Sequence, residues 1–439
     1  MKIQKCFMML LSLAVLCLMG ACAEQDTDIP RTQVEVGLEN PKDVEGLNIV
    51  EQELKLTNLT TGKTESFTDF EGINLMEGLY DCSYSAHVTY VAKNTDGEES
   101  EVKGILSGKA ENVEITSNSK KITVETALTF ESDDFIFEEI FFAGTLRSSG
   151  SQYYGDSYIK IYNNTDHVLY ADGLAFCESK FKSTQYFDYS PDIRKDTMTI
   201  WSLYVIPGSG KEHPVMPGQS LLLCDTGIDH RTANPNSIDL SHADFEWYDV
   251  STQPDHMDID SPTVPNLDKW YCYTESFYVL HNRGYTSFAL ARIPIGKEEY
   301  LQKYKYTYRY TQYLPAGTFP MQQEAYKMPN AWIVDGVNCS VEAKRLWNIL
   351  PPALDAGWTH CGKIDGDKTR YFRSVRRKLQ YLNTDGTMHL QDTNNSTEDF
   401  NTECIPSIVE IQHTAIDAQG TKANKETYDG IVEKYLSSG

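Results

Sequence analysis

Beyond its first twenty residues the chain has no long apolar run. The longest such run extends from Phe7 to Met19, about 13 residues, whereas a helix needs about 20 apolar residues to cross the roughly 30 Å of bilayer hydrocarbon. No later stretch is apolar for long enough to span a membrane. We therefore expect no transmembrane helix, and any hold on a membrane must have another basis.

Basic residues are scarce as well. The chain has 39 Lys and Arg against 63 Asp and Glu, which gives a formal net charge of −24. Proteins bind nucleic acids and anionic lipid head groups largely by neutralising phosphates with Lys and Arg. The charge balance therefore disfavours both, and we expect no nucleic-acid partner.

The motifs of several common enzyme classes are missing. The chain has no Walker loop, no dinucleotide-binding fingerprint, no H-E-x-x-H and no G-x-S-x-G nucleophile turn. Asp225, His230 and His242 lie near Ser241 in the sequence, and these residue types form hydrolase triads, but nearness in sequence does not establish triad geometry. We expect a protein that is not an enzyme, with a hydrolase inside the long insertions as an alternative.

Cysteine pairs at metal-binding spacing are also absent. The cysteines beyond residue 22 are scattered, with no C-x-x-C: Cys82, Cys177, Cys224, Cys272, Cys339, Cys361 and Cys404. An odd number of cysteines cannot all pair within one chain. We expect most of them to be buried thiols that pack as small hydrophobic side chains.

The N-terminal segment, by contrast, carries a clear pattern. Lys2 and Lys5 precede the apolar run, which ends in the small-residue box Met19-Gly20-Ala21-Cys22. A positive start, a short apolar stretch and small residues before a cysteine are typical of a bacterial lipoprotein signal. We expect residues 1–21 to be the signal peptide and Cys22 to carry the lipid, each buried CH2 of which contributes about 0.8 kcal/mol. A plain signal peptide with an incidental Cys22 is the alternative.

Residues 22–30 form an acidic tether, with Glu24, Asp26 and Asp28 close to the lipidated cysteine. This tether resembles the one that directs Bacteroidetes lipoproteins to the outer face of the outer membrane. The resemblance implies a lipid-anchored protein of the outer membrane, exposed at the cell surface.

From residue 31 to about 130 the chain alternates between short strand patterns and turns. Val34-Glu35-Val36, Leu54-Lys55-Leu56 and Ile122-Thr123-Val124 are examples, and Thr61-Gly62 and Asp96-Gly97 are turn signals. Closely spaced strands of this kind predict a small antiparallel β-sandwich. The stretch after Glu77-Gly78 resembles the immunoglobulin- or transthyretin-like modules of Bacteroidetes surface proteins.

Residues 134–416 form a second, larger β pattern, followed by a polar C-terminal tail over residues 417–439. Its segments include Phe135 to Phe142, Y-I-K-I-Y-N-N-T-D from Tyr158, P-G-Q-S-L-L-L from Pro217, S-F-A-L from Ser287, I-V-D-G-V from Ile333, V-R-R-K from Val375 and D-T-N-N-S-T-E-D-F from Asp392. This order resembles bacterial lamin-tail-like domains, which implies an immunoglobulin-type β-sandwich. The whole combination also resembles a Bacteroidetes surface-lipoprotein family described only as a domain of unknown function. The expected fold is therefore mainly β, with a small sandwich followed by a larger one that carries long loop insertions.

The insertions span residues 176–215 and 227–275. Binding sites commonly lie on loops that a rigid scaffold positions, so these segments are where we look for a ligand site. A short helix is also expected from Val341 to Trp347, because Ser340 can cap its start and Pro351-Pro352 ends it.

Four tyrosines alternate with polar residues in the most unusual local pattern: Tyr304, Tyr306, Tyr308 and Tyr310. Period-two alternation puts them on one face of a strand, with Lys305 and Arg309 on the other. An exposed row of rings could bind sugars, aromatic ligands or a partner protein. Strand alternation also produces such rows when one face is simply buried as core, and we favour that alternative.

One acidic loop is a weak candidate for calcium, through Asp255, His256, Asp258 and Asp260. Calcium accepts carboxylate oxygens in flexible loops, but this segment lacks the glycine and distal glutamate of a helix-loop-helix calcium site. A solvated acidic loop is the main expectation, and we expect no resident cofactor.

Together these patterns predict a lipid-anchored surface protein that binds a ligand or partner. Lipoproteins of this kind commonly accompany TonB-dependent outer-membrane transporters, so a role as an accessory to uptake is the leading hypothesis. Adhesion or cell-envelope structure, with another envelope protein as partner, is the alternative.

Overall fold

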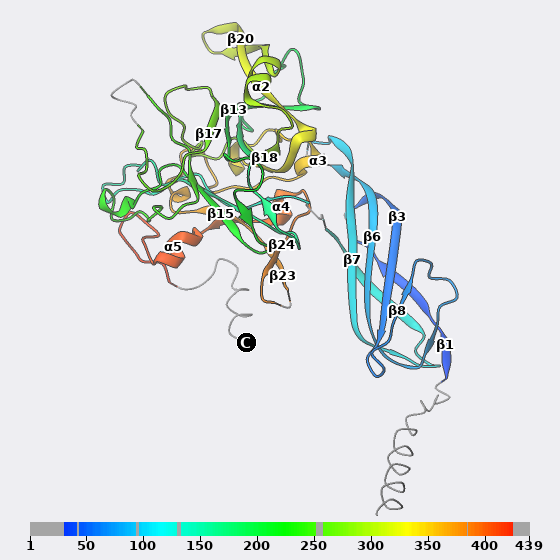
Figure 1. The fold of residues 1–439 in the computed structure, drawn as a ribbon. Helices are drawn as coiled ribbons and strands as arrows, with labels where there is room; N and C mark the ends of the chain where they lie inside the picture. Colours follow the sequence, from blue (N-terminus) through cyan, green and yellow to red (C-terminus); the bar gives the residue numbers. More distant parts are fainter. Residues whose placement is uncertain are drawn as a thin grey trace, which may run out of the picture. The chain divides into compact units, whose positions relative to one another are not determined.

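The computed structural model describes residues 30–41, 44–93, 96–129, 133–251, 258–383 and 385–424. The predicted signal peptide, Cys22, most of the tether, Asp255, His256 and residues 425–439 lie outside the described residues. The protein is mainly β and its strands form several sheets, as Figure 1 shows and as the sequence predicted. No helix among the described residues is long and apolar enough to cross a bilayer.

Contacts divide the chain into two compact units. Of the described residues, the first unit comprises those up to 41 together with 49–87 and 106–127, and the second comprises 44–48, those within 88–105 and those from 128 onward. The finer boundaries expected from the sequence, 31–130 and 134–416, remain predictions.

The N-terminal strands form a six-stranded sheet and a two-stranded one. The larger sheet has the order β2 (Glu35–Glu39), β8 (Lys121–Thr129), β7 (Glu99–Ile115), β6 (Gly78–Lys93), β3 (Glu45–Asn58) and β4 (Thr64–Phe67). The smaller pairs β1 (Arg31–Gln33) with β5 (Asn74–Met76). In β6 every second side chain is buried, including Tyr80, Cys82 and Tyr84. Alternation between buried and open positions is what a sheet with one core-facing side requires.

Residues beyond 133 form a sandwich of two large sheets. One has the order β16 (Phe245–Glu246), β15 (Ser220–Cys224), β10 (Tyr158–Tyr162), β9 (Ile136–Phe141), β22 (Ser374–Arg377) and β25 (Phe400–Cys404). The other has the order β19 (Lys305–Leu314), β20 (Gly317–Pro329), β13 (Thr197–Val205), β12 (Leu174–Ser179), β18 (Ser287–Arg292) and β21 (Ile333–Asn338), and β17 (Asp268–Cys272) pairs with β13. Two small ribbons pair β11 (Leu169–Tyr170) with β14 (Pro214–Val215) and β23 (Leu379–Leu382) with β24 (Met388–Leu390).

The main hydrophobic core lies between the two large sheets. Leu174 and Phe176 of β12 belong to it, as do Phe137 and Ile140 of β9, whereas Ala175 and Cys177 belong to a second cluster on the other face of β12. Every residue of β12 is buried. A central strand covered on both faces has no polar side, which explains the continuous apolar runs in this part of the sequence.

Short helices and single turns lie between the strands in the sequence. The α-helices are α2 (Lys297–Lys303), α3 (Pro352–Asp355), α4 (Ser396–Asp399) and α5 (Ser407–Gln412), and the 3-10 turns are η1 (His230–Thr232), η3 (Asn330–Trp332), η4 (Glu342–Lys344) and η5 (Lys368–Arg370). Tyr300 of α2 packs on the β12 side, and Val409 of α5 packs beside Tyr158 and Cys224.

The helix predicted from Val341 to Trp347 is wrong. Only the single turn η4 forms there. Pro352, which was expected to follow the end of a helix, is instead the first residue of α3. The Trp347 indole instead donates hydrogen bonds to the carbonyls of Lys182 and Gln185, at 3.1 and 2.8 Å. Those tertiary contacts outweigh the local helical propensity.

All seven cysteines of the described residues are buried and free. This confirms the prediction of buried thiols. Cys177, for example, packs beside Ile200 and Ala289 in the cluster outside β12.

A buried ionic cluster ties the end of the larger sandwich together. Arg377 is 2% exposed and contacts Asp335 at 2.7 Å, Asp392 at 3.1 Å and Asp399 at 3.6 Å. Its guanidinium also donates to the carbonyl of Phe137 at 2.7 Å. A buried charge needs such partners, so the V-R-R-K segment serves the fold.

Candidate functional site

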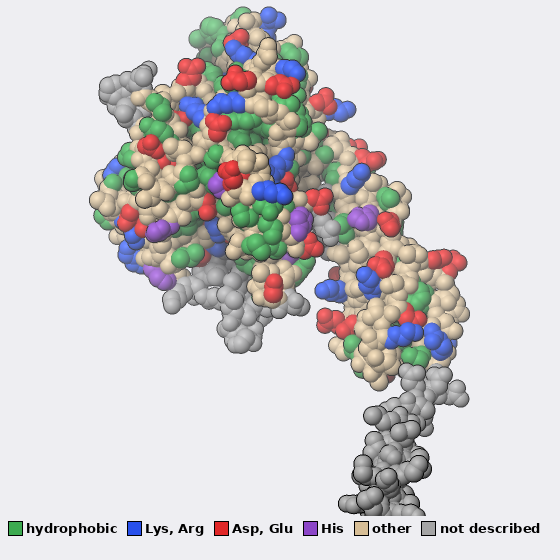
Figure 2. Space-filling model, in the orientation of Figure 1, with side chains coloured by type: hydrophobic (Ala, Val, Ile, Leu, Met, Phe, Trp, Pro, Cys, Tyr) green, Lys and Arg blue, Asp and Glu red, His purple; other side chains and the backbone are tan. Residues whose placement is uncertain are grey.

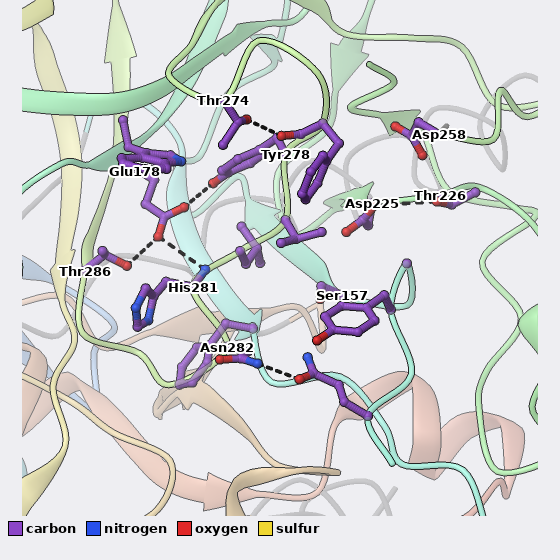
Figure 3. A pocket seen from close by; sticks show the side chains of 18 of the residues that line it. Ser157, Glu178, Asp225, Thr226, Asp258, Thr274, Tyr278, His281, Asn282 and Thr286 are labelled. Carbon is purple, nitrogen blue, oxygen red and sulfur yellow. Dashed lines mark hydrogen bonds between the residues drawn. The ribbon is translucent and has the colours of Figure 1, made fainter. Parts of the chain in front are cut away.

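A cavity of about 700 Å³ opens among loops of the larger sandwich. Six segments line it: the β9–β10 loop, the end of β12 with the residues just after it, β13, the chain after β15, the connection from β16 to β17, and the long connection from β17 to β18. Figure 3 shows Glu178, Thr286 and His281 on one side and Asp225, Thr226 and Asp258 on the other. Cavities of this size hold small organic molecules.

Glu178 is the best-connected polar group of the cavity. Its carboxylate accepts hydrogen bonds from the Tyr278 hydroxyl at 2.6 Å, the Thr286 hydroxyl at 2.5 Å and the His281 backbone N–H at 3.3 Å. Burial raises the pKa of Glu178 to about 7, against the lowering effect of these donors. Glu178 can therefore gain or lose a proton near neutral pH.

Asp225 differs from Glu178 because its carboxyl group lacks good partners. It is 4% exposed, its Oδ1 faces the Thr226 hydroxyl at a long 3.5 Å, and its Oδ2 has no hydrogen-bond partner among the described residues. Burial raises the pKa of Asp225 well above its ordinary value, and the negative charge of Asp258 adds to the effect. Figure 3 shows the carboxyl pointing into the cavity.

Lys180 lies in an aromatic clamp at the edge of the cavity. Its Nζ lies 3.3 Å from the ring centre of Tyr273 and 5.0 Å from that of Trp201. Burial lowers the pKa of this lysine to about 8. Rings that face a partly desolvated ammonium group stabilise its charge, so the clamp fixes where the lysine lies.

The remaining wall is aromatic and apolar, with Phe142, Phe277 and Leu280 among its residues. His281 adds a ring whose Nδ1 is buried without a hydrogen-bond partner among the described residues. Burial, helped by the nearby charges of Lys182 and Arg283, lowers the pKa of His281 to about 3. His281 is therefore neutral at physiological pH and offers a nitrogen without adding charge.

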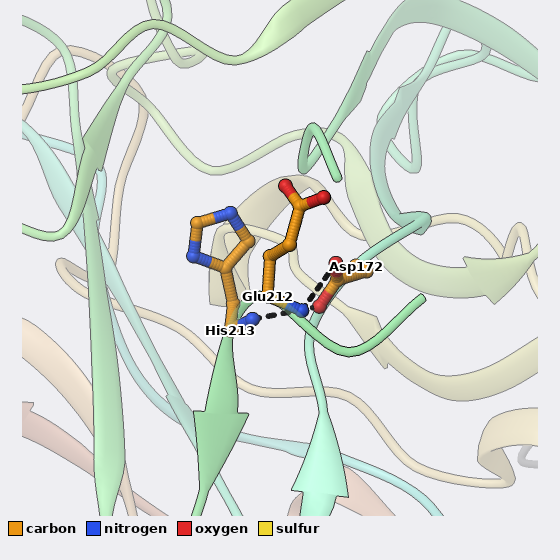
Figure 4. Close-up of side chains that lie close together, drawn as sticks. All are labelled: Asp172, Glu212 and His213. Carbon is orange, nitrogen blue, oxygen red and sulfur yellow. Dashed lines mark hydrogen bonds between the residues drawn. The ribbon is translucent and has the colours of Figure 1, made fainter. Parts of the chain in front are cut away.

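A second cluster, Asp172, Glu212 and His213, brings three potential metal ligands together (Figure 4). Asp172 already accepts the backbone N–H groups of Gly210, Glu212 and His213, at 2.9–3.1 Å. Burial alone would raise the pKa of Asp172, but these donors lower it below the ordinary value. The carboxylate thus closes the loop before β14, and this cluster serves as a structural cap.

Only part of the predicted calcium loop, Asp258 and Asp260, lies among the described residues. Asp255 and His256 lie outside the described residues. Asp258 Oδ2 accepts the Asp249 backbone N–H at 3.0 Å, and Asp260 accepts the Asn266 amide at 3.0 Å. Asp258 and Asp260 do not join a metal-like cluster within the described part of the chain, and Asp258 instead lines the cavity.

The tyrosine row is largely covered. Tyr308 is 3% exposed and meets Phe181 edge-on at 5.4 Å, while Tyr306 and Tyr310 pack beside it in the same cluster. Tyr304 lies just after α2, outside β19, and stacks on Tyr300 at 5.3 Å. The prediction that Tyr304 belongs to the strand is wrong, and the burial of the other rings favours the core alternative over a binding row.

The residues considered as a hydrolase set do not assemble. The Ser241 hydroxyl bonds to Asp239 at 2.6 Å, and the ring nitrogens of His230 contact the Tyr153 hydroxyl and the Thr226 carbonyl, both at 2.9 Å. Of this set, Asp225 alone lines the cavity.

Glu178, Lys180 and the segment from Thr274 to Thr286 line the cavity but were not predicted as site residues from the sequence. A signal was present for Glu178, because it follows Leu174 and Phe176 at alternate positions and so occupies a core-facing place in an apolar strand. A charged side chain at such a position is more informative than an exposed one. The 274–286 segment has no comparable pattern.

Comparison with known proteins supports the fold without assigning an activity. Residues 216–407 match the model of a family described as protein of unknown function, DUF4876. The crystal structure of a DUF4876 family protein from Bacteroides thetaiotaomicron is similar, with a TM-score of 0.52 and 21% sequence identity over 85% of this chain and 95% of that one. No curated protein matches the chain. The likeness supports the β architecture.

Proposed function

We propose that this protein is a lipid-anchored outer-membrane lipoprotein that captures a small organic ligand at the cell surface, without transforming it. The cavity of the larger sandwich carries the proposal, because it joins a ligand-sized volume to convergent polar groups from several chain segments. An adhesive or purely structural module has no need for a buried carboxyl group such as Asp225, one oxygen of which has no partner among the described residues and which points into a cavity.

The other parts of the proposal rest on the sequence. The lipoprotein box ending at Cys22 and the acidic tether support anchoring at the outer membrane. Such lipoproteins commonly work with TonB-dependent transporters, which would receive the captured ligand. The proposal includes membership of a Bacteroidetes surface-lipoprotein family and a lamin-tail-like topology for the larger sandwich.

Ligand loading tests the cavity directly. The purified protein, residues 22–439, is incubated with the small-molecule fraction of the host's growth medium and separated by gel filtration, and the molecules released on denaturation are identified by mass spectrometry. We expect wild type to retain a compound that Val279→Trp does not, because Val279 lines the cavity and the larger ring fills it.

The matched control is Ile411→Trp, which puts the same ring at a 74%-exposed position of α5. This control should retain the compound as wild type does. Equal retention by Val279→Trp, with both variants folded by circular dichroism, would contradict the proposal.

A further inference from the structure

The end of the cavity at Asp225 lacks a positive charge to balance its acids, and ligand capture alone does not explain this. Asp225 is buried and its Oδ2 lacks a partner among the described residues. An ionised carboxylate in such a place is costly unless an opposite charge or strong donors meet it. The group therefore points to something that arrives from the cavity.

The neighbouring acids are satisfied where Asp225 is not. Asp156 accepts from the hydroxyls of Thr145 and Ser237, at 2.5 and 2.6 Å. Asp249 pairs with Lys269 at 2.7 Å. Asp258, half-buried, receives backbone N–H donors. The negative charges of these three acids all act on Asp225, so a positive group would be stabilised beside it.

The two lysines that line the cavity, Lys180 and Lys182, interact with groups other than Asp225. Lys180 is held over the rings of Tyr273 and Trp201. Lys182 acts on Glu178 and His281, which Figure 3 places on the side opposite Asp225. The cavity thus has an acidic end, at Asp225 and Asp258, that its own lysines do not neutralise.

The volume and the lining residues of the cavity indicate what kind of cation fits. A bare metal ion would leave most of the roughly 700 Å³ and its aromatic lining without contact. Rings such as Phe142, Tyr153 and Phe277 favour an apolar body next to the charged atom. Size and lining together select an organic cation.

We propose that the ligand class of this cavity is an organic ammonium compound with an apolar body, whose positive nitrogen pairs with Asp225 at the end lined by Asp258. This inference rests on the proposed function, since it identifies the chemistry of what the same cavity captures. The nitrogen supplies Asp225 Oδ2 with the donor and the opposite charge that it lacks.

Three probes of nearly equal shape test the charge. Binding of 2-phenylethylamine, 2-phenylethanol and phenylacetate to the purified protein is measured by isothermal titration calorimetry at pH 7. We expect the amine to bind at least about tenfold more tightly than the alcohol or the acid, because only the amine can pair with a buried carboxylate.

Asp225→Asn should weaken binding of the amine at least about tenfold and leave binding of the alcohol unchanged. Asp166→Asn, the same exchange at a fully exposed side chain of the same sandwich, should change neither. If Asp225→Asn does not fold, Asp258→Asn takes its place, with a smaller loss for the amine alone.

Three results would overturn the inference: an alcohol that binds as tightly as the amine, unchanged amine binding in the folded Asp225 variant, or no probe binding at all. The loading experiment separates these failures from a failure of capture. If the retained compound has no amino group, the ammonium assignment is wrong and ligand capture still holds. If Val279→Trp retains as much compound as wild type, or neither protein retains any, both proposals are wrong.

Discussion

Glu178 and Asp225 stand at or just after the ends of apolar strands, and burial changes the chemistry of both carboxyl groups. Glu178 has three donors and titrates near neutrality, whereas Asp225 has an oxygen without a partner among the described residues. A fold optimised for stability alone would replace such groups with apolar ones. Their presence in a ligand-sized cavity is what links single residues to function.

The pKa of Glu178 makes a prediction about stability. Its folded-state pKa of about 7 lies above the ordinary value of 4.5, so the folded protein binds more protons than the unfolded chain between those pH values. Stability from this group is therefore present at low pH and is lost as pH rises from about 4.5 to about 7. Glu178→Gln should match wild type near pH 4.5 and exceed it by about 2–3 kcal/mol at pH 7.5, at one pKa unit per 1.36 kcal/mol.

Urea denaturation of both proteins at the two pH values measures this difference in the free energy of unfolding. The contributions of the other titrating groups cancel, because the two proteins share them. Glu324→Gln, at a 65%-exposed side chain, should follow wild type throughout. A Glu178→Gln variant that tracks wild type at both pH values would show that Glu178 keeps an ordinary pKa.

At the scale of elements, alternation within single strands decides which side chains are core. In β19 Tyr308 is 3% exposed and Tyr313 is 75% exposed, although both belong to the same tyrosine-rich run. Tyr308 bonds to Gln323 of β20 at 2.9 Å and meets Phe181. The strand therefore contains both a core position and its own surface control.

Tyr308→Ala should destabilise the protein by about 3 kcal/mol or more, because it empties a filled aromatic site. Tyr313→Ala should change the free energy of unfolding by less than about 0.5 kcal/mol. Chemical denaturation followed by tryptophan fluorescence compares the two. Equal, small effects would mean that the row is not core and would restore it as a candidate binding surface.

The strands were the predictable part of this protein. The apolar runs from Phe135 and Tyr158 correspond to β9 and β10, because buried strands need continuous apolar sequence. The helix expected before Trp347 failed, because that indole and the turn η4 follow tertiary hydrogen bonds rather than local propensity. Elements set by their own pattern were predictable, and elements set by distant contacts were not.

The candidate site was predictable only in part, for a related reason. Asp225 and Asp258 were singled out for a hydrolase set and a calcium loop, yet both line one cavity. The partners of Glu178 come from 100 or more residues away, at Tyr278 and Thr286. No local pattern encodes such a convergence, because it depends on how the two sheets and their loops pack.

At the scale of the whole molecule, the β scaffold and the cavity suit a binding protein. Glu178 lies near the end of β12, a strand buried on both faces, so the scaffold holds this carboxyl group in a fixed position. On the face shown in Figure 2, acidic and basic side chains are interspersed. The acid excess on which the proposed ligand class depends lies inside the cavity, at Asp225 and Asp258.

The most direct test is the intact native mass of the protein isolated from the host's own outer membranes. The account predicts a chain that begins at Cys22, carries fatty acyl groups there, and holds a small noncovalent ligand that gentle collisional activation releases. The Cys22→Ala variant, expressed in the same host, should lack the mass of the acyl groups and should not be attached to the membrane. A wild-type mass equal to the unmodified chain with an empty cavity would contradict both the anchor and the capture.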